Sequence, residues 1–186
     1  TLSLHDALPI SSIFGVSYSR AWKELIGSES IYHVKPEQVS KTPESGEYLP
    51  KGSFVIRGEK NFFRNVRLGI AIGIKVVSSD LDHESIFNFV DADKINEILA
   101  KKNTMLRDLE NIHALVIGGP ESALKDQALH YVLISPSRDG LSSGKLAAKL
   151  QKLFEKKVNG LFSQKFLEVD IEEIQKWIPS GKSRIN

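Results

Sequence analysis

The chain is organised around the stretch YHVKPEQVSKTPESGEYLPKGSFVIRGEKN, which runs from Tyr32 to Asn61. A short β-branched and aromatic segment, Ile31 to Val34, opens it, and the proline that follows ends the strand because proline has no amide hydrogen for a sheet ladder. Apolar and polar residues alternate over 53–57, which predicts a returning strand with Phe54 facing the core. The polar loop from Glu37 to Gly52 carries two prolines and two glycines. The pattern predicts a rigid hairpin.

Hydroxyls, amides and spaced cations are concentrated on this hairpin and on the connection that follows it. Contacts to phosphate and ribose are hydrogen bonds combined with charge neutralisation, and these are the side chains that make them. The pattern predicts a surface for phosphate and sugar groups, and its candidate residues are Lys35, Gln38, Ser40, Lys41, Thr42, Arg57, Lys60, Asn61, Arg64 and Arg67.

The composition is that of a folded domain. The chain has 186 residues, of which 41% are hydrophobic, enough for one moderate domain or two small ones. No apolar run approaches the roughly 20 residues of a membrane helix. There are no cysteines, which excludes disulfides and thiolate metal sites and fits a cytoplasmic protein. The first ten residues, TLSLHDALPI, lack helical or strand periodicity and are interpreted as a non-native leader.

Charge is segregated along the chain although the net charge is only +2. Residues 20–75 sum to +4, residues 76–133 to −5, and residues 134–186 to +4. Charge alone favours ordinary solvated faces of a globular protein. The alternative is that the two basic regions around an acidic middle form a surface for a polyanion.

Two elements frame the hairpin in sequence. A helical pattern starts near Ser12 and places Trp22 on its apolar stripe, so Trp22 is predicted to be a core residue. The segment Val66 to Val77 alternates large apolar residues with small or polar ones, which predicts one strand with two different faces. We expect the helix to pack on the small face, where Ala71 and Gly73 allow close approach.

Further along, an acidic helical connection is predicted over 79–112. Two strands, 113–118 and 129–134, are each followed by a helix, which predicts a βαβα module. The second helix, Ser142 to Asn159, is amphipathic. Its lysine row consists of Lys145, Lys149, Lys152 and Lys156. Alone, such a row indicates a solubilising face, and the alternative is a secondary phosphate-tracking surface, for which Arg20 is a further candidate. A terminal helix is predicted to begin after the capping residue Asp170.

Signatures of catalysis are missing from the sequence. The five histidines have no metal-ligand spacing, and no nucleophile stands beside a base. Around the SSGKL run, Gly140 and Gly144 are too close together for a phosphate loop. We therefore expect no enzyme activity, no cofactor and no resident metal. A weaker alternative is a metal-dependent nuclease that uses Asp80, Asp82 and His83.

The residues of the hairpin also carry a family resemblance. YSRAW at Tyr18–Trp22, QVSKT at Gln38–Thr42, SGEYL at Ser45–Leu49, GSF at Gly52–Phe54 and IRG at Ile56–Gly58 closely resemble the carboxy-terminal half of the NFACT-R domain. That domain belongs to the NEMF and RqcH ribosome quality control proteins, long labelled fibronectin-binding-protein-like. The similarity covers about residues 12 to 76, and the chain looks like a carboxy-terminal piece of an archaeal-type member.

The resemblance implies an α+β fold with a mixed sheet and packing helices. The expected boundaries are 1–10 for the leader, 11–78 for half of NFACT-R, 79–112 for the connection, and 113–186 for the βαβα module with its terminal helix. The implied partners are tRNA and large ribosomal subunits obstructed by peptidyl-tRNA, with no membrane or DNA partner. A scaffold that docks on ribosomal proteins remains the alternative.

Overall fold

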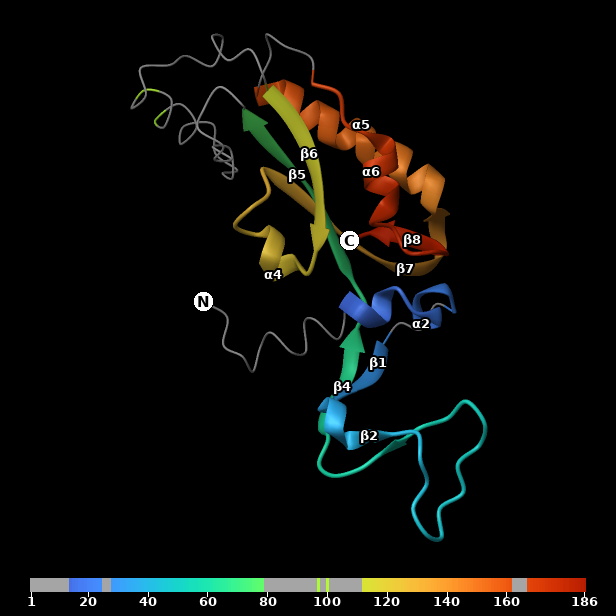
Figure 1. Cartoon of the computed structure of the whole chain (residues 1–186). Helices are drawn as coiled ribbons and strands as arrows, with labels where there is room; N and C mark the ends of the chain where they lie inside the picture. Colours follow the sequence, from blue (N-terminus) through green and yellow to red (C-terminus); the bar gives the residue numbers. More distant parts are fainter. Residues whose placement is uncertain (1–13, 25–27, 79–96, 98–99, 101–111, 162–166) are drawn as a thin grey trace.

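The computed structural model describes residues 14–24, 28–78, 97, 100, 112–161 and 167–186. These residues form an α+β fold in which helices pack on an antiparallel sheet, which confirms the predicted fold class. Below the sheet, a two-stranded ribbon of β1 (Ser28–His33) and β4 (Asn61–Arg67) leads to residues 34–60. These residues form an arm that projects away from the rest of the molecule (Figure 1). The expected leader and nearly all of the acidic connection lie outside the described residues.

The described residues build one four-stranded sheet in the order β6-β5-β7-β8. Its strands are β5 (Ile70–Ser78), β6 (Ile112–Gly119), β7 (His130–Ser142) and β8 (Lys182–Ile185). Every pairing between them is antiparallel. The two strands expected in the βαβα module are not neighbours, because β5 lies between them and pairs with both.

One face of the sheet carries the main core. Alternate residues of β5, from Ile70 to Val76, are fully buried beneath α5 (Ser143–Leu161) and α6 (Ile171–Lys176). The amphipathic helix predicted over Ser142–Asn159 corresponds to α5, and it buries Leu146, Leu150 and Phe154. Burial of such apolar side chains at roughly 25 cal/mol per Å² is the main force that holds the two layers together.

The opposite face is covered by a different element from the one that the sequence suggested. Ala71 packs with Leu124 and Ala128, residues of and after α4 (Glu121–Leu124). A Cβ on Gly73 would lie 2.9 Å from that of Ala128. The small face therefore does admit close approach, but the expectation that the amino-terminal helix lies there is wrong.

The amino-terminal helix is broken within the described residues. A helical turn over 14–17 is followed by a break, and Ser19 caps α2 (Arg20–Lys23) by accepting from the amide of Ala21. Ser19 ends the first turn as well, since its hydroxyl donates to the carbonyl of Val16 at 2.6 Å. Trp22 is fully buried in the main core, as predicted.

The ribbon and the arm differ from the predicted hairpin in their pairing. The strand β1 (Ser28–His33) pairs with β4 (Asn61–Arg67) and not with 53–57. Between them, β2 (Val39–Ser40) pairs with β3 (Val55–Ile56) as a second, smaller ladder. The single strand expected over 66–77 is divided between β4 and β5, with Leu68 and Gly69 at the junction.

The carboxy-terminal residues complete the sheet. Asp170 caps α6 through a bond from the amide of Glu172 at 2.8 Å, as the sequence predicted. The strand β8 was not predicted. A Cβ on Gly140 would lie 2.4 Å from the carbonyl oxygen of Ser183, so this glycine lets the bent β7 approach β8.

Candidate nucleic-acid interface

The arm is shaped by two tight turns. The amide of Glu47 donates to the carbonyl of Glu44, and that of Ser53 donates to the carbonyl of Pro50, both at 3.0 Å. Gly46 and Gly52 occupy the third position of these turns with φ near +86°. A residue with a side chain adopts that conformation only under strain, so glycine is required there.

Gln38 is the internal clamp of the arm. Its amide nitrogen donates to the carbonyls of Arg57 at 2.8 Å and Glu59 at 2.6 Å, and its oxygen accepts from the amide of Lys35 at 2.8 Å. Its backbone carbonyl accepts from the amide of Arg57 at 2.9 Å. The sequence predicted Gln38 as an RNA contact, and the structure instead uses both ends of its side chain to hold the arm together.

The side chain of Arg57 also makes contacts within the arm. Its guanidinium forms an ion pair with Glu47, lies 3.2 Å from a carboxylate oxygen of Glu44, and donates to the carbonyl of Thr42 at 3.4 Å. The Nε–Glu44 pair is an ion pair by distance without hydrogen-bond geometry, since that buried nitrogen has no hydrogen-bond partner among the described groups. Two carboxylates offset the charge of Arg57, which makes it a support of the loop rather than an exposed phosphate contact.

Glu47 is held in its charged form. The amide of Glu44 donates to its carboxylate at 2.8 Å. This bond lowers the pKa of Glu47 below its ordinary value, partial burial opposes the shift, and Arg57 lowers the pKa further. The ion pair therefore persists at neutral pH.

The remaining predicted contacts of the arm and of β4 fall into four groups. Lys35 and Lys41 are exposed, and neither has an ion-pair partner in the part of the chain that the structure describes. Ser40 is half-buried, and its hydroxyl closes a small turn with Thr42. Lys60 is exposed and engaged in a further contact. The side chains of Asn61 and Arg64 lie outside the described part of β4.

Two aromatic residues of the arm were not predicted as functional. Tyr48 is 89% exposed and Phe54 is 56% exposed, so the expectation that Phe54 faces a core is wrong. Exposed aromatic rings beside cations are typical of surfaces on which unpaired bases stack. The position of Tyr48 between the two turn glycines was the sequence signal for an exposed ring.

The lysine row of α5 is one surface. At 3.6 residues per turn, Lys145, Lys149, Lys152 and Lys156 fall within a sector of about 60°, opposite the buried stripe of the helix. All four are exposed. Arg20, in contrast, is ion-paired with Glu24 one turn along α2.

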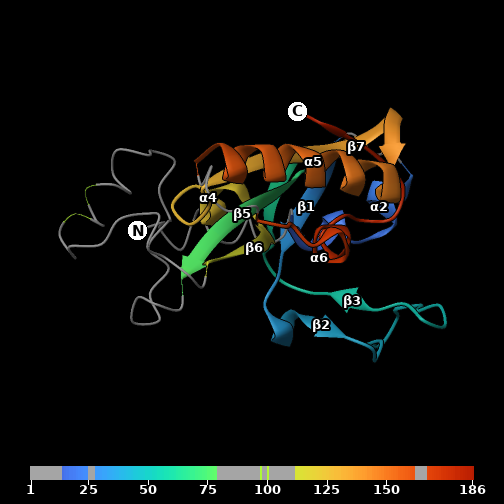
Figure 2. The ribbon, with the colours of Figure 1, turned by 90° about the horizontal axis from the view of Figure 1, so that it is seen from above.

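The arm and the lysine row are separate surfaces. Seen from above, α5 lies along one side of the molecule and β2 and β3 lie on the other (Figure 2). The structure therefore does not bring the two predicted sets of cations together into a single patch.

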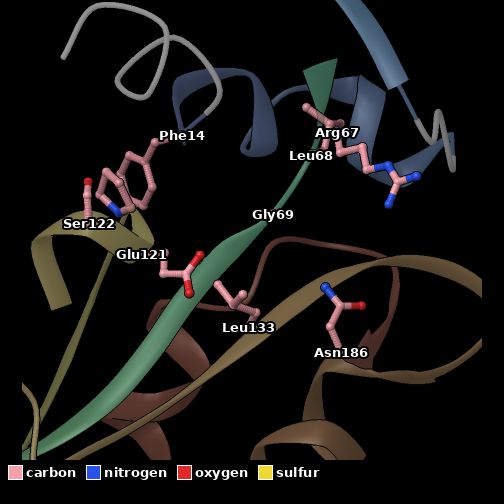
Figure 3. A pocket seen from close by; sticks show the side chains of 9 residues that line it. Phe14, Arg67, Leu68, Gly69, Glu121, Ser122, Leu133 and Asn186 are labelled. Carbon is pink, nitrogen blue, oxygen red and sulfur yellow. The ribbon is translucent and has the colours of Figure 1, made fainter. Parts of the chain in front are cut away.

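Arg67 lies in a third place, beside two hollows at the junction of β4 and β5. One hollow has a volume of about 400 Å³ and lies between Phe14, the start of α4 and the carboxy-terminal Asn186 (Figure 3). The second, of about 730 Å³, also takes in Arg184 of β8.

Comparison with known proteins places these features in a family. Residues 5–58, which include the whole arm up to Gly58, match the NFACT protein RNA binding domain. The chain is 31% identical over 172 residues to the archaeal Rqc2 homolog aRqcH of Methanocaldococcus jannaschii, a match that covers 92% of this chain and 19% of that protein.

The chain is homologous to the Rqc2/NEMF ribosome quality control proteins and contains an NFACT RNA binding domain. It is also 46% identical over 59 residues to the NEMF homolog of Drosophila melanogaster and 51% identical over 47 residues to human NEMF, matches that cover 32% and 24% of the chain. The archaeal match thus extends beyond the arm into the four-stranded sheet. The chain spans about a fifth of the archaeal relative and less of the animal ones.

The family is named for RNA binding and not for catalysis. The carboxylates and histidine of the nuclease alternative, Asp80, Asp82 and His83, lie outside the described residues. In the part of the chain that the structure describes, no helix combines the length and the apolar character needed to cross a bilayer.

Proposed function

We propose that this chain is a cytoplasmic RNA-binding module of a ribosome quality control factor, and that its arm contacts tRNA on large ribosomal subunits obstructed by peptidyl-tRNA. Lys35, Lys41 and Thr42 touch the ribose-phosphate backbone, and Lys60, Asn61 and Arg64 extend the contact along β4. Gln38, Ser40 and Arg57 hold the frame on which these side chains stand. The lysine row of α5 and Arg20 form a secondary surface for a different segment of RNA.

The internal pairing of the arm carries this proposal. Gln38 donates to backbone carbonyls, and Arg57 pairs with Glu44 and Glu47, so these two carboxylates are occupied. Lys35 and Lys41 then project from a fixed loop with no carboxylate partner among the described residues. Preorganised, unneutralised cations are what a phosphate chain requires, because binding releases counterions and orders little of the protein.

The test is tRNA binding by the whole chain, measured by fluorescence anisotropy between about 50 and 200 mM salt. The double variant K35A/K41A should weaken binding and lower the slope of log affinity against log salt by about 0.7 to 0.9 per lysine. The matched control is Lys125→Ala, an exposed lysine at the end of α4, far from the arm in sequence. An unchanged slope in K35A/K41A would overturn the proposal.

The same variants distinguish RNA binding from the alternative, a scaffold that docks on ribosomal proteins. The exposed Tyr48 and Phe54 also suit a protein-docking surface. If K35A/K41A keeps its tRNA affinity and loses binding to large subunits, the arm docks on ribosomal protein and not on RNA.

A further inference from the structure

The larger hollow beside Arg67 has a lining suited to an anion. Seven described residues line its volume of about 730 Å³, and none of them is acidic: Arg67, Leu68, Ser135, Pro136, Arg184, Ile185 and Asn186. The hollow has the size of a small-ligand site, and its polar groups include two guanidiniums.

Strand register brings these polar groups to one face of the sheet. Ser135 of β7 pairs with Arg184 of β8, and Leu133, two residues earlier on β7, pairs with Ala71 of β5. Because side chains alternate between faces, Ser135 and Arg184 share the face that bears Ala71. This is the face opposite the main core.

The residues that cover this face of the sheet do not extend as far as the hollow. The residues of and after α4, Leu124 and Ala128, lie over Ala71. Beyond Ala71 comes Gly69, which has no side chain, and then Arg67 at the end of β4. Arg67 and Arg184 are both exposed at this uncovered end of the sheet.

The two guanidiniums keep their full charge and hydrogen-bonding capacity. Arg20 and Arg57 are paired with glutamates, but Arg67 and Arg184 have neither an ion pair nor a side-chain hydrogen bond within the described part of the chain. Ser135 donates its hydroxyl to the amide oxygen of Asn186 at 2.8 Å, which leaves the amide nitrogen of Asn186 as a further donor. Figure 3 shows Arg67 extending on the side of Asn186, away from Ser122 and Phe14.

We propose that Arg67 and Arg184 bind a backbone phosphate of RNA in this hollow. The inference rests on the proposed function and extends it from the arm to the sheet, since β4 runs from the arm to Arg67. Guanidinium presents a fork of donors that matches two phosphate oxygens, and none of the described residues that line the hollow has an acidic side chain to compete. RNA leaving the arm along β4 would meet this pair of arginines next.

The test measures tRNA binding by the whole chain with R67Q, R184Q and the double variant. The matched control is Arg138→Gln, an exposed arginine on β7 outside the lining of the hollow. Each hollow variant should weaken tRNA binding about tenfold, as expected for a charged hydrogen bond, and should flatten the salt dependence, while R138Q leaves both unchanged. R67K and R184K should restore part of the affinity, and circular dichroism should show the same melting curve for all variants.

The outcomes separate the two proposals. If the unmodified chain binds tRNA and R67Q/R184Q binds it equally well, the hollow is not a phosphate site and the arm alone carries the function. If K35A/K41A has no effect while R67Q/R184Q does, the arm proposal fails and the hollow stands. A second experiment titrates adenosine monophosphate or inorganic phosphate into the complex of the chain with tRNA. Competition by either at concentrations comparable to tRNA would overturn the RNA assignment in favour of a free phosphate ligand.

Discussion

The indole N–H of Trp22 donates to the hydroxyl of Ser183 at 3.0 Å, and both residues are fully buried. The bond joins α2 to β8 across 161 residues of sequence. Gly181, just before β8, lies against the backbone of Lys23, where a Cβ would be 3.3 Å from its Cα. The amino-terminal segment is thus fixed to the edge of the sheet, and with it the ribbon that carries the arm.

Loss of the Ser183 hydroxyl should destabilise the fold. Ser183→Ala leaves a buried indole donor without an acceptor, which costs about 1 to 3 kcal/mol of unfolding free energy in urea denaturation. Ser142→Ala, at an exposed position paired with Lys182 on the same two strands, should change stability by no more than about 0.5 kcal/mol. In the background of Trp22→Phe, the Ser183→Ala cost should shrink. Equal costs in both backgrounds would show that the bond contributes nothing.

Gly118 and Gly160 should respond to alanine in opposite directions. A Cβ at Gly118 of β6 would lie 2.2 Å from Cδ2 of Trp177, inside the ring, whereas a Cβ at Gly160 of α5 meets nothing within 4 Å. Gly118→Ala should lower the free energy of unfolding by about 1 to 3 kcal/mol through overpacking. Gly160→Ala should raise it by about 0.5 to 1 kcal/mol, because alanine loses less backbone entropy in a helix. Thermal melts of the two variants check the signs.

Periodicity predicted the elements that a core covers. The strands β6 and β7 contain short apolar runs and the helix α5 carries an apolar stripe, and the burial of Trp22 followed from its place on another such stripe. In such segments local pattern and tertiary packing select the same conformation. The cap at Asp170 was predictable for the same reason, since its bonds are made within one turn.

The arm was less predictable because no core covers it. Alternation assigns a face only where one face is buried, and Phe54 has no such face to occupy. The roles of Gln38 and Arg57 depend on carbonyls and carboxylates that the turns at Gly46 and Gly52 bring near, and charge alone does not reveal such partners. The strand β8 was missed because KSRI is too short to show a period, and β7 supplies its pairing.

Acid should loosen the arm before it affects the sheet. Glu47 has a folded pKa below its ordinary value of 4.5, chiefly because of the bond from Glu44. For a carboxyl group with a lowered pKa, the stabilisation is fully present above the unfolded value and is lost as pH falls through the folded one. Amide signals of the arm, followed by nuclear magnetic resonance, should therefore shift with a midpoint below 4.5, while those of β5 stay in place.

Glu47→Gln should abolish that transition and leave the arm loosened at neutral pH. Glu37→Gln is the control, because Glu37 is exposed on the same arm and makes no ion pair among the described residues. An acid transition with the same midpoint in both variants would assign it to another carboxyl group.

Tyr48 should contribute to RNA binding without contributing to its salt dependence. The ring is 89% exposed on the loop that Gln38 and Arg57 hold, so it is available to an unpaired base. Stacking of one base on an aromatic ring is worth about 1 to 3 kcal/mol and involves no counterion. Tyr48→Ala should therefore weaken binding of an unstructured single-stranded RNA by about tenfold or more, with an unchanged slope against log salt.

Two further variants make the assignment specific. Tyr48→Phe keeps the ring and should bind as the unmodified chain does, which excludes a role for the hydroxyl. Lys41→Ala should change the slope and leave the stacking in place, so the losses in Y48A and K41A should add if the residues act independently. A changed salt slope in Y48A, or equal losses of RNA affinity in Y48F and Y48A, would contradict base stacking. Protein docking would then be the better explanation of the exposed ring.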